Sequence, residues 1–289
     1  MNPSQVVNPA SVPQRSLFRY PGGKTWLVPR LRQWLRAMPR PQLLVEPFAG
    51  GGIISLTAVA EDLVEQVLLV ELDAEVAAVW EVIVAGRGRE LGEAITDFPL
   101  QEDTVQELLE NPTKDPITLA LKTIVRNRVQ RGGILAPGAG RLRTGENNKG
   151  LSSRWYPETL AKRLQAIDGY QQQLTFQCAD GIEVLEQHTQ DTNAVFFIDP
   201  PYSASRAGKN AGKRLYRHHQ LDHRQLFKIA SELQGQVLLT YDNDPEVRQL
   251  ATEHGFQYQA VLMRNTHHAQ LEELLISRDL SWLSDPDTS

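Results

Sequence analysis

Residues 43–52 read LLVEPFAGGG. The first four form a short apolar run that ends in an acid, which predicts a buried strand over residues 43–46. Apolar residues behind the glycines predict a helix over residues 53–60. A glycine turn between a strand and a helix lets a ligand approach the backbone and offers it the N–H groups of the helix start. The spacing is not G-x-G-x-x-G, which excludes the dinucleotide fingerprint and leaves a purely structural turn as the alternative.

The chain on either side of this turn alternates short apolar runs with helical stretches, which is typical of an α/β sheet with crossover connections. Further strands are predicted over residues 67–71, 174–178, 194–198 and 236–241, and a closing antiparallel pair over residues 257–263 and 272–277. Helices are predicted between them over residues 74–84, 181–188, 222–233 and 245–254. The sequence therefore predicts one α/β sheet domain.

A long interval between the second and third strands interrupts this rhythm. It contains predicted helices over residues 101–110, 116–130 and 157–167, and a glycine-rich, basic loop over residues 132–153. A loop of that length inside a compact domain is usually functional or disordered. We expect residues 86–164 to form an inserted, mostly helical subdomain within a discontinuous catalytic domain of residues 17–85 and 165–280. Residues 1–16, which contain three prolines, are expected to be a flexible tail.

Composition narrows the class of protein. The chain has 289 residues and a single cysteine, Cys178, which excludes an internal disulfide and a multi-cysteine zinc site. It has no apolar run long enough to span a membrane and no signal-peptide pattern, so a reducing, cytoplasmic setting is expected. The net charge is −5, yet basic residues dominate two stretches, residues 122–163 and 206–228. These stretches indicate a local surface for a polyanion, with a solvated charged face as the alternative.

The sharpest signal is Asp199-Pro200-Pro201-Tyr202, directly after the strand predicted over residues 194–198. The exocyclic amine of adenine is a poor nucleophile because its lone pair is delocalised into the ring. The Asp199 carboxylate and the Pro200 carbonyl can accept both amine hydrogens, and the prolines stiffen the loop that holds them. Tyr202 offers a flat face on which a purine can stack. Glu71, at the end of the second strand, can accept hydrogen bonds from the ribose hydroxyls of an adenosine moiety.

Two further motifs carry weaker signals. Tyr20-Pro21-Gly22-Gly23-Lys24 suggests a P-loop, but Phe18 stands where that motif needs its first glycine. What remains is an aromatic residue and a lysine on a tight turn. His219 and His223 have the four-residue spacing of a helical metal site, but Asp222 as a helix cap would place His219 outside the helix. No metal site is therefore predicted.

Taken in order, Tyr20 to Lys24, Glu46 to Gly52, Glu71 and Asp199 to Tyr202 resemble the Dam-type, D12 class DNA adenine-N6 methyltransferases over about residues 17–280. The resemblance implies a Rossmann-like, seven-stranded class I methyltransferase sheet with a helical DNA-recognition insert, and S-adenosylmethionine as cofactor. It implies catalytic roles for Asp199, Pro200, Pro201 and Tyr202. It also implies cofactor contacts from Tyr20, Lys24, Glu46, Pro47, Phe48, Ala49, Gly50, Gly52, Glu71, Asp180 and Asp199.

The expected reaction is direct in-line methyl transfer to N6 of an adenine flipped out of double-stranded DNA. Residues expected to contact DNA are Arg126, Asn127, Arg128, Arg131, Arg141, Arg143, Arg214 and Arg217. A monomer or weak dimer is expected, with a cognate restriction endonuclease as a potential partner. The alternatives are a DNA cytosine-N4 methyltransferase, a non-catalytic DNA-binding protein that retains the fold, and an enzyme that methylates RNA or a protein amide.

Overall fold

The computed structural model describes residues 7–8, 11–19, 23–135, 139–142, 150–201, 221–264 and 270–284. Its strands are β1 (Leu43–Glu46), β2 (Gln66–Val70), β3 (Leu174–Gln177), β4 (Ala194–Ile198), β5 (Gln236–Asp242), β6 (Gln257–Arg264) and β7 (Gln270–Ser277). Its α-helices are α1 (Val28–Arg36), α2 (Ile53–Ala60), α3 (Ala74–Val84), α4 (Gly88–Asp97), α5 (Glu102–Glu110), α6 (Pro116–Val129), α7 (Pro157–Asp168), α8 (Gly181–Gln187), α10 (His223–Glu232) and α11 (Pro245–Glu253). A 3-10 helix, η2 (Lys24–Leu27), leads into α1.

All seven strands form one sheet in the order β3-β2-β1-β4-β5-β7-β6. The first five strands of this order run parallel to one another, while β7 runs antiparallel to both β5 and β6. This confirms the predicted seven-stranded sheet and its closing antiparallel pair. The strand order reverses between β1 and β4, and ligands of open α/β sheets bind at such a switch point, beyond the carboxyl ends of the strands.

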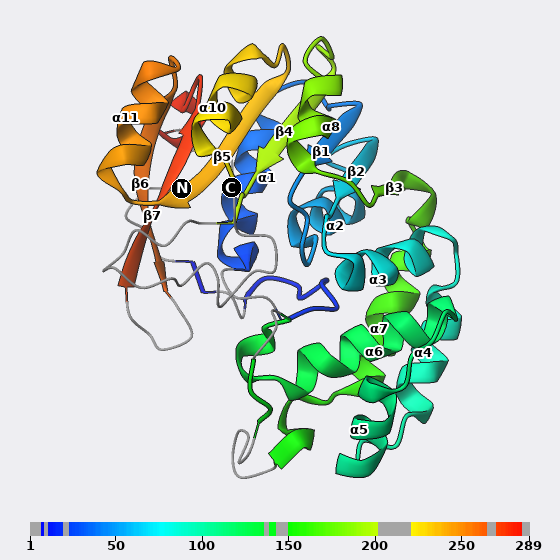
Figure 1. The fold of residues 1–289 in the computed structure, drawn as a ribbon. Helices are drawn as coiled ribbons and strands as arrows, with labels where there is room; N and C mark the ends of the chain where they lie inside the picture. The colour runs from blue at the N-terminus through cyan, green and yellow to red at the C-terminus, as the bar shows by residue number, and fades with distance from the viewer. Residues whose placement is uncertain are drawn as a thin grey trace.

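Helices cover both faces of the sheet (Figure 1). Successive residues of a strand point to opposite faces, so Leu44 packs with α1, α2 and α3 while Val45 packs with α8, α10 and α11. In β4, Phe197 belongs to the first of these clusters and Phe196 to the second. A strand buried on both faces reads as a continuous apolar run, which is why the central strands could be located in the sequence.

The inserted segment folds into α4, α5, α6 and α7, which lie together beside α3 in Figure 1. Asp115 accepts a hydrogen bond from the Thr118 amide at 2.8 Å and Pro116 takes the first position of α6, a favourable start for a helix. Leu91, Ile95 and Leu164 share one hydrophobic cluster with the sheet and α3. Helices α4 and α7 therefore pack on the same core as the sheet and α3, and α7, which contains residue 164, runs on to Asp168.

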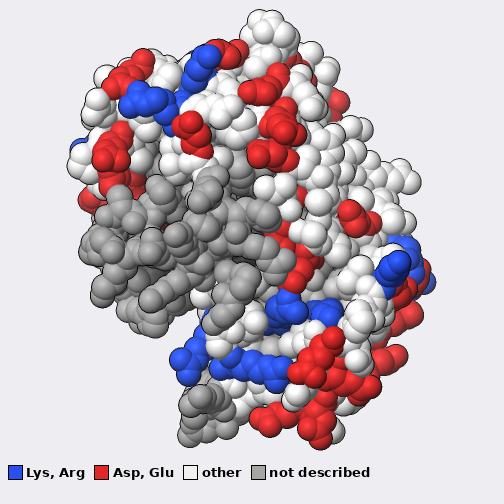
Figure 2. Space-filling view, in the orientation of Figure 1, with Lys and Arg blue, Asp and Glu red and all other residues white. Residues whose placement is uncertain are grey.

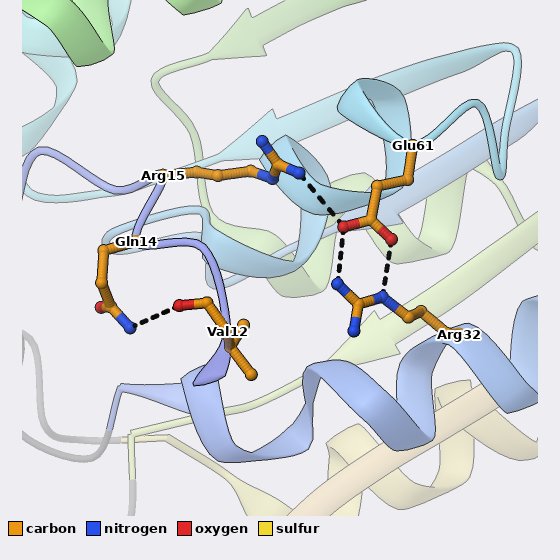
Figure 3. A network of polar contacts seen from close by, with 5 residues as sticks. All are labelled: Val12, Gln14, Arg15, Arg32 and Glu61. Atoms are coloured by element: carbon orange, nitrogen blue, oxygen red, sulfur yellow. Dashed lines mark hydrogen bonds and ion pairs between the residues drawn. The ribbon is translucent and has the colours of Figure 1, made fainter. Parts of the chain in front are cut away.

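Of the flexible tail expected over residues 1–16, the described residues 11–16 pack against the domain. Val12 is buried in the core, and Arg15 lies 3.1 Å from the Glu61 carboxylate (Figure 3). Arg32 of α1 donates to both Glu61 oxygens, at 2.6 and 2.7 Å, and these bonds are the main reason that the pKa of Glu61 is lowered. Residues 11–19, which we call the N-terminal strap, thus pack against the domain. The prolines of this segment suggested flexibility, but the contacts of Val12 and Arg15 hold it in place.

Candidate active site

Because β1, β2, β3 and β4 are parallel, the residues that follow them meet at one edge of the sheet. The glycine turn follows β1 and Glu71 follows β2. Asp180 lies in the loop after β3, and Asp199 follows β4. The structure thus brings together the residues that the sequence analysis placed at strand ends.

The glycine turn is held in a conformation that glycine favours. Gly50 and Gly52 have positive φ values of 47° and 59°. The Trp80 indole N–H of α3 donates to the Gly50 carbonyl at 3.0 Å, and the Gly50 amide donates to Glu71 Oε2 at 3.0 Å. Ala49 is buried and its amide donates to the Val70 carbonyl at 2.9 Å. The turn is therefore fixed by β2 and α3.

Glu46 lies beneath this turn and is almost completely buried. One oxygen of its carboxylate, Oε2, accepts from the Ser55 hydroxyl at 2.5 Å and from the Ser55 amide at 3.1 Å. Burial is the largest influence on its pKa and raises it to about 8, against the lowering effect of the Ser55 bonds. Glu46 thus ties the end of β1 to the start of α2, which shapes the turn.

Glu71 faces the glycine turn from the end of β2. Its two oxygens accept from different backbone amides, Oε2 from Gly50 and Oε1 from Asp73, the latter at 2.9 Å. Burial is the main cause that raises its pKa to about 7. Its carboxylate is held in place by the main chain, as an acceptor for a diol must be.

The loop after β3 touches the loop after β1. Asp180 caps α8 by accepting from the Ile182 amide at 2.8 Å. A Cβ added at Gly181 would lie 2.3 Å from the Pro47 carbonyl oxygen and 3.0 Å from the Phe48 ring, so only glycine allows this approach. Asp180, Pro47 and Phe48 are therefore neighbours at the sheet edge.

Asp199 contacts residues from two other parts of the chain, and one of them, Lys24, also contacts a second carboxylate. The Thr240 hydroxyl of β5 donates to Asp199 Oδ1 at 2.9 Å, and Lys24 Nζ lies 3.1 Å from the same oxygen. Lys24 Nζ also lies 3.2 Å from Oε2 of Glu273 on β7. Lys24 and Glu273 are buried, whereas the Asp199 side chain is 22% exposed. Asp199 is therefore the member of this group that a substrate can contact.

Sequence reasoning identified Lys24 and Asp199 but missed Thr240 and Glu273. Thr240 reads as one more residue of an apolar strand, and Glu273 as one of two acids at the start of another. The signal that could have found Glu273 is its place within a strand buried on both faces, where a carboxylate needs a cation. Pro200 is buried and Pro201 half-buried, while Tyr20 and Tyr202 lie outside the described residues.

Two residues of α6 that were expected to contact DNA instead form hydrogen bonds with the N-terminal strap. Asn127 is fully buried: its Oδ1 accepts from the Arg19 amide at 2.9 Å, and its Nδ2 donates to the carbonyls of Arg19 and Gly133 at 3.0 and 2.7 Å. Arg128 is also buried and donates to the Leu17 carbonyl. Burial is the main cause that lowers its pKa to about 9. In this arrangement neither side chain is available to DNA.

The strap also reaches the glycine turn. The Ser16 hydroxyl donates to the Gly51 carbonyl at 2.6 Å, and Arg163 of α7 donates to the Ser16 carbonyl at 2.6 Å. The chain that leads to Lys24 is thus fixed to the insert on one side and to the turn on the other.

The remaining basic residues of the insert differ in exposure. Arg126 forms an ion pair with Glu75 of α3, whereas Arg131 and Arg141 are exposed on a short antiparallel bridge between Gln130 and Arg141. In Figure 2, Lys and Arg side chains gather on the part of the insert nearest the catalytic domain, and Asp and Glu side chains cover its far end. Arg143, Arg214 and Arg217 lie outside the described residues.

Asp222 caps α10 as predicted, since its side chain accepts from the Gln225 amide at 3.0 Å and the helix begins at His223. The His223 ring lies 3.0 Å from the Tyr241 hydroxyl, and His219 lies outside the described residues. Within the described ranges, no helix combines the length and apolarity that crossing a membrane requires.

The chain also matches a known protein family. A family model for D12 class N6 adenine-specific DNA methyltransferases matches residues 20–265. The DNA N-6-adenine-methyltransferase of Escherichia phage P1 is 25% identical over 275 residues, which are 90% of this chain and 34% of that protein. The chain therefore spans about a third of the length of this relative.

Solved structures show more distant likenesses. A SAM-dependent methyltransferase from Agrobacterium tumefaciens has a TM-score of 0.40 and 13% identity, covering 86% of this chain and 59% of that one. An rRNA methyltransferase from Streptomyces viridochromogenes has a TM-score of 0.39 and 14% identity, covering 90% of this chain and 86% of that one. The family assignment does not depend on these two structures.

Proposed function

Since this chain belongs to the D12 class N6 adenine-specific DNA methyltransferase family, we propose that it transfers a methyl group from S-adenosylmethionine to N6 of adenine in double-stranded DNA. The observation that carries the proposal is the place of Asp199. It follows β4, whose neighbour β1 ends in the glycine turn, so an amine at Asp199 lies beside a cofactor at the turn. Neighbouring strands are about 4.8 Å apart, so the loops that would hold the amine and the cofactor are adjacent.

The residues at the turn fit S-adenosylmethionine. Gly50 and Gly52 adopt positive φ values, and these set the turn that places the start of α2 where a ligand can approach the backbone. Glu71 presents a carboxylate fixed by two backbone amides, which suits the two hydroxyls of a ribose. We propose that Pro47, Phe48 and Asp180 contribute the remaining wall, together with Tyr20 as a prediction from the sequence.

The proposed chemistry needs an amine held in the correct orientation. When bound, S-adenosylmethionine would supply a methyl group on a positively charged sulfur. N6 would form its new bond to the methyl carbon as the bond between that carbon and the sulfur breaks. Asp199 and the Pro200 carbonyl accept the two amine hydrogens, which draws the N6 lone pair out of conjugation. The proton that N6 loses leaves through the Asp199 carboxylate. Tyr202 stacks on the base in this proposal.

A stacked adenine cannot reach Asp199, so we propose that the target base is flipped out of the duplex. Helices α4 to α7 would then form the target-recognition insert. Its exposed Arg131 and Arg141 are proposed to contact DNA, and Arg143, Arg214 and Arg217 remain predictions for the same role. We also propose that the protein is a monomer or weak dimer in the cytoplasm. A cognate restriction endonuclease is proposed as its partner.

The experiment that tests this function is methylation of duplex DNA with methyl-labelled S-adenosylmethionine, followed by digestion and identification of the labelled nucleoside. Label in N6-methyldeoxyadenosine supports the proposal. Label in N4-methyldeoxycytidine would assign the rival reaction on the same kind of amine. An absence of label in DNA, with label entering RNA or protein instead, would reject DNA as the substrate.

Glu71→Gln is expected to weaken S-adenosylmethionine binding about 10- to 100-fold, because hydrogen bonds to a charged acceptor are worth roughly 1.5–3 kcal/mol. The amide NH2 would also face one of the backbone amides that Glu71 now accepts from. Isothermal titration calorimetry measures the change. In the wild type, burial raises the pKa of Glu71 to about 7, so the ionised acceptor forms, and cofactor affinity rises, as pH increases through 7.

Glu65→Gln is the matched control, since Glu65 is exposed just before β2. Its cofactor affinity should equal that of the wild type. Equal affinity in Glu71→Gln as well would remove Glu71 from the cofactor site.

A further inference from the structure

Glu273 is a buried carboxylate that has no role in the methyl transfer proposed for Asp199. It lies on β7 and is 4% exposed. Its strand register places it opposite Asp242 of β5, and Lys24 Nζ lies 3.2 Å from its Oε2. Burying a charge is costly unless it is paired, so Lys24 offsets the cost of this position.

Lys24 is itself 3% exposed and lies between two carboxylates, 3.1 Å from Asp199 Oδ1 and 3.2 Å from Glu273 Oε2. A lysine ammonium sits on a flexible four-carbon stem, so one partner alone does not fix its position. Contacts on two sides restrict it. Glu273 therefore determines where the ammonium that contacts Asp199 lies.

Charge gives Glu273 a second effect. A lone ammonium beside Asp199 would neutralise that carboxylate and weaken it as an acceptor. With Glu273 on the other side of Lys24, the three groups together carry a net negative charge when all are ionised. Apolar replacement of a buried ion pair is often neutral or stabilising, so stability alone is a poor reason for three charges here.

We propose that Glu273 is a positioning residue for methyl transfer: it holds the Lys24 ammonium so that this ammonium, together with Thr240, orients the Asp199 carboxylate toward the target amine. The inference rests on the proposed function and adds to it a residue that touches neither substrate nor cofactor.

The titration of Glu273 predicts a pH dependence of kcat, which would be absent if Glu273 only stabilised the fold. Its pKa is raised to about 7, mainly by burial; Lys24 lowers this pKa, while Asp199 and Asp242 contribute to raising it. Only the ionised form attracts Lys24. At saturating cofactor and DNA, kcat of the wild type should therefore rise as pH increases through 7.

The test compares Glu273→Gln with Glu272→Gln in the full chain. Glu272 is exposed on the same strand, where it accepts from Asn243 at 2.7 Å, so its variant controls for loss of an acid from β7. E273Q is expected to lower kcat about 10- to 100-fold, to change cofactor and DNA affinities less than about threefold, and to lose the pH dependence near 7. E272Q should behave as the wild type.

A double-mutant cycle tests whether Glu273 acts through Lys24. In a Lys24→Met background, adding E273Q should change kcat less than about threefold, because the group it positions is gone. Equal effects of E273Q in both backgrounds would overturn the inference. Should E273Q fail to fold, Glu273→Asp keeps the charge but shortens the side chain. It is expected to lower kcat while retaining the pH dependence, and an unchanged kcat would overturn the inference.

The outcomes separate the two proposals. A wild type that methylates no adenine overturns the proposed function and this inference with it. An active wild type whose kcat and pH profile are unchanged in E273Q overturns the inference alone.

Discussion

Asp199→Ala is expected to lower kcat for methyl transfer at least about 10³-fold, since loss of one preorganised electrostatic group at a reacting centre costs about 10²–10³ and this variant also removes one of the two carboxylates that contact Lys24. Affinity for S-adenosylmethionine should stay within about threefold, because the proposed cofactor contacts come mainly from the ends of β1, β2 and β3. Label incorporation into duplex DNA measures the first quantity and calorimetry the second.

Asp191→Ala is the control for this substitution. Asp191 lies in the turn before β4, where it accepts from the Asn193 amide at 3.1 Å, and its loss should leave both quantities unchanged. If D199A lost cofactor affinity in parallel with turnover, Asp199 would be a cofactor ligand and the amine-binding role would be wrong.

Gly52→Ala is expected to destabilise the fold by about 2–5 kcal/mol, combining about 1–2 kcal/mol for a left-handed backbone with about 1–3 kcal/mol for overpacking. Its φ is 59°, and an added Cβ would lie 2.6 Å from the Trp80 ring and 2.8 Å from Leu69. Trp80 would have to move, and its indole N–H holds the Gly50 carbonyl. Cofactor affinity should therefore fall at least tenfold as well. Urea unfolding and calorimetry measure the two effects.

Gly86→Ala separates backbone strain from collision. Gly86 also has a positive φ, 73°, but nothing lies within 4 Å of the Cβ that the variant would add. It should cost only about 1–2 kcal/mol, the backbone part alone, and leave cofactor affinity unchanged. Equal destabilisation by the two variants would mean that the packing against Trp80 does not constrain the turn.

The parts of the fold that local pattern determines were predictable. The bounds of β1, α2, α3 and β4 agree with those expected, because buried runs end at acids, glycines or capping residues. Helix α4 was not predicted. Gly88 and Gly92 lower its intrinsic propensity, and Leu91 and Ile95 become buried only through packing in the insert. Gly92 faces Ala161 of α7, and a Cβ added there would make ordinary van der Waals contact at 3.5 Å from the Ala161 Cα.

Within the site, residues that belong to motifs could be found in the sequence, and residues placed by tertiary contacts could not. Asp199 and Glu71 end strands, which is a local property. The apolar residues beside Glu273 indicate that its carboxylate needs a cation, but that the cation is Lys24 follows only from the way β7 packs beside β5. Asn127 and Arg128 belong to a basic segment and were therefore expected at DNA, but their burial against the N-terminal strap depends on how α6 packs.

The central claim is that the carboxylate of Asp199 prepares an adenine amine for methylation. The most direct measurement is nucleoside analysis of DNA from cells that lack adenine methylation of their own and express either the wild type or D199A. We predict N6-methyldeoxyadenosine with the wild type and none with D199A at equal protein levels. Methylated adenine that persists with D199A, or a methyl group found only on cytosine, would contradict the claim.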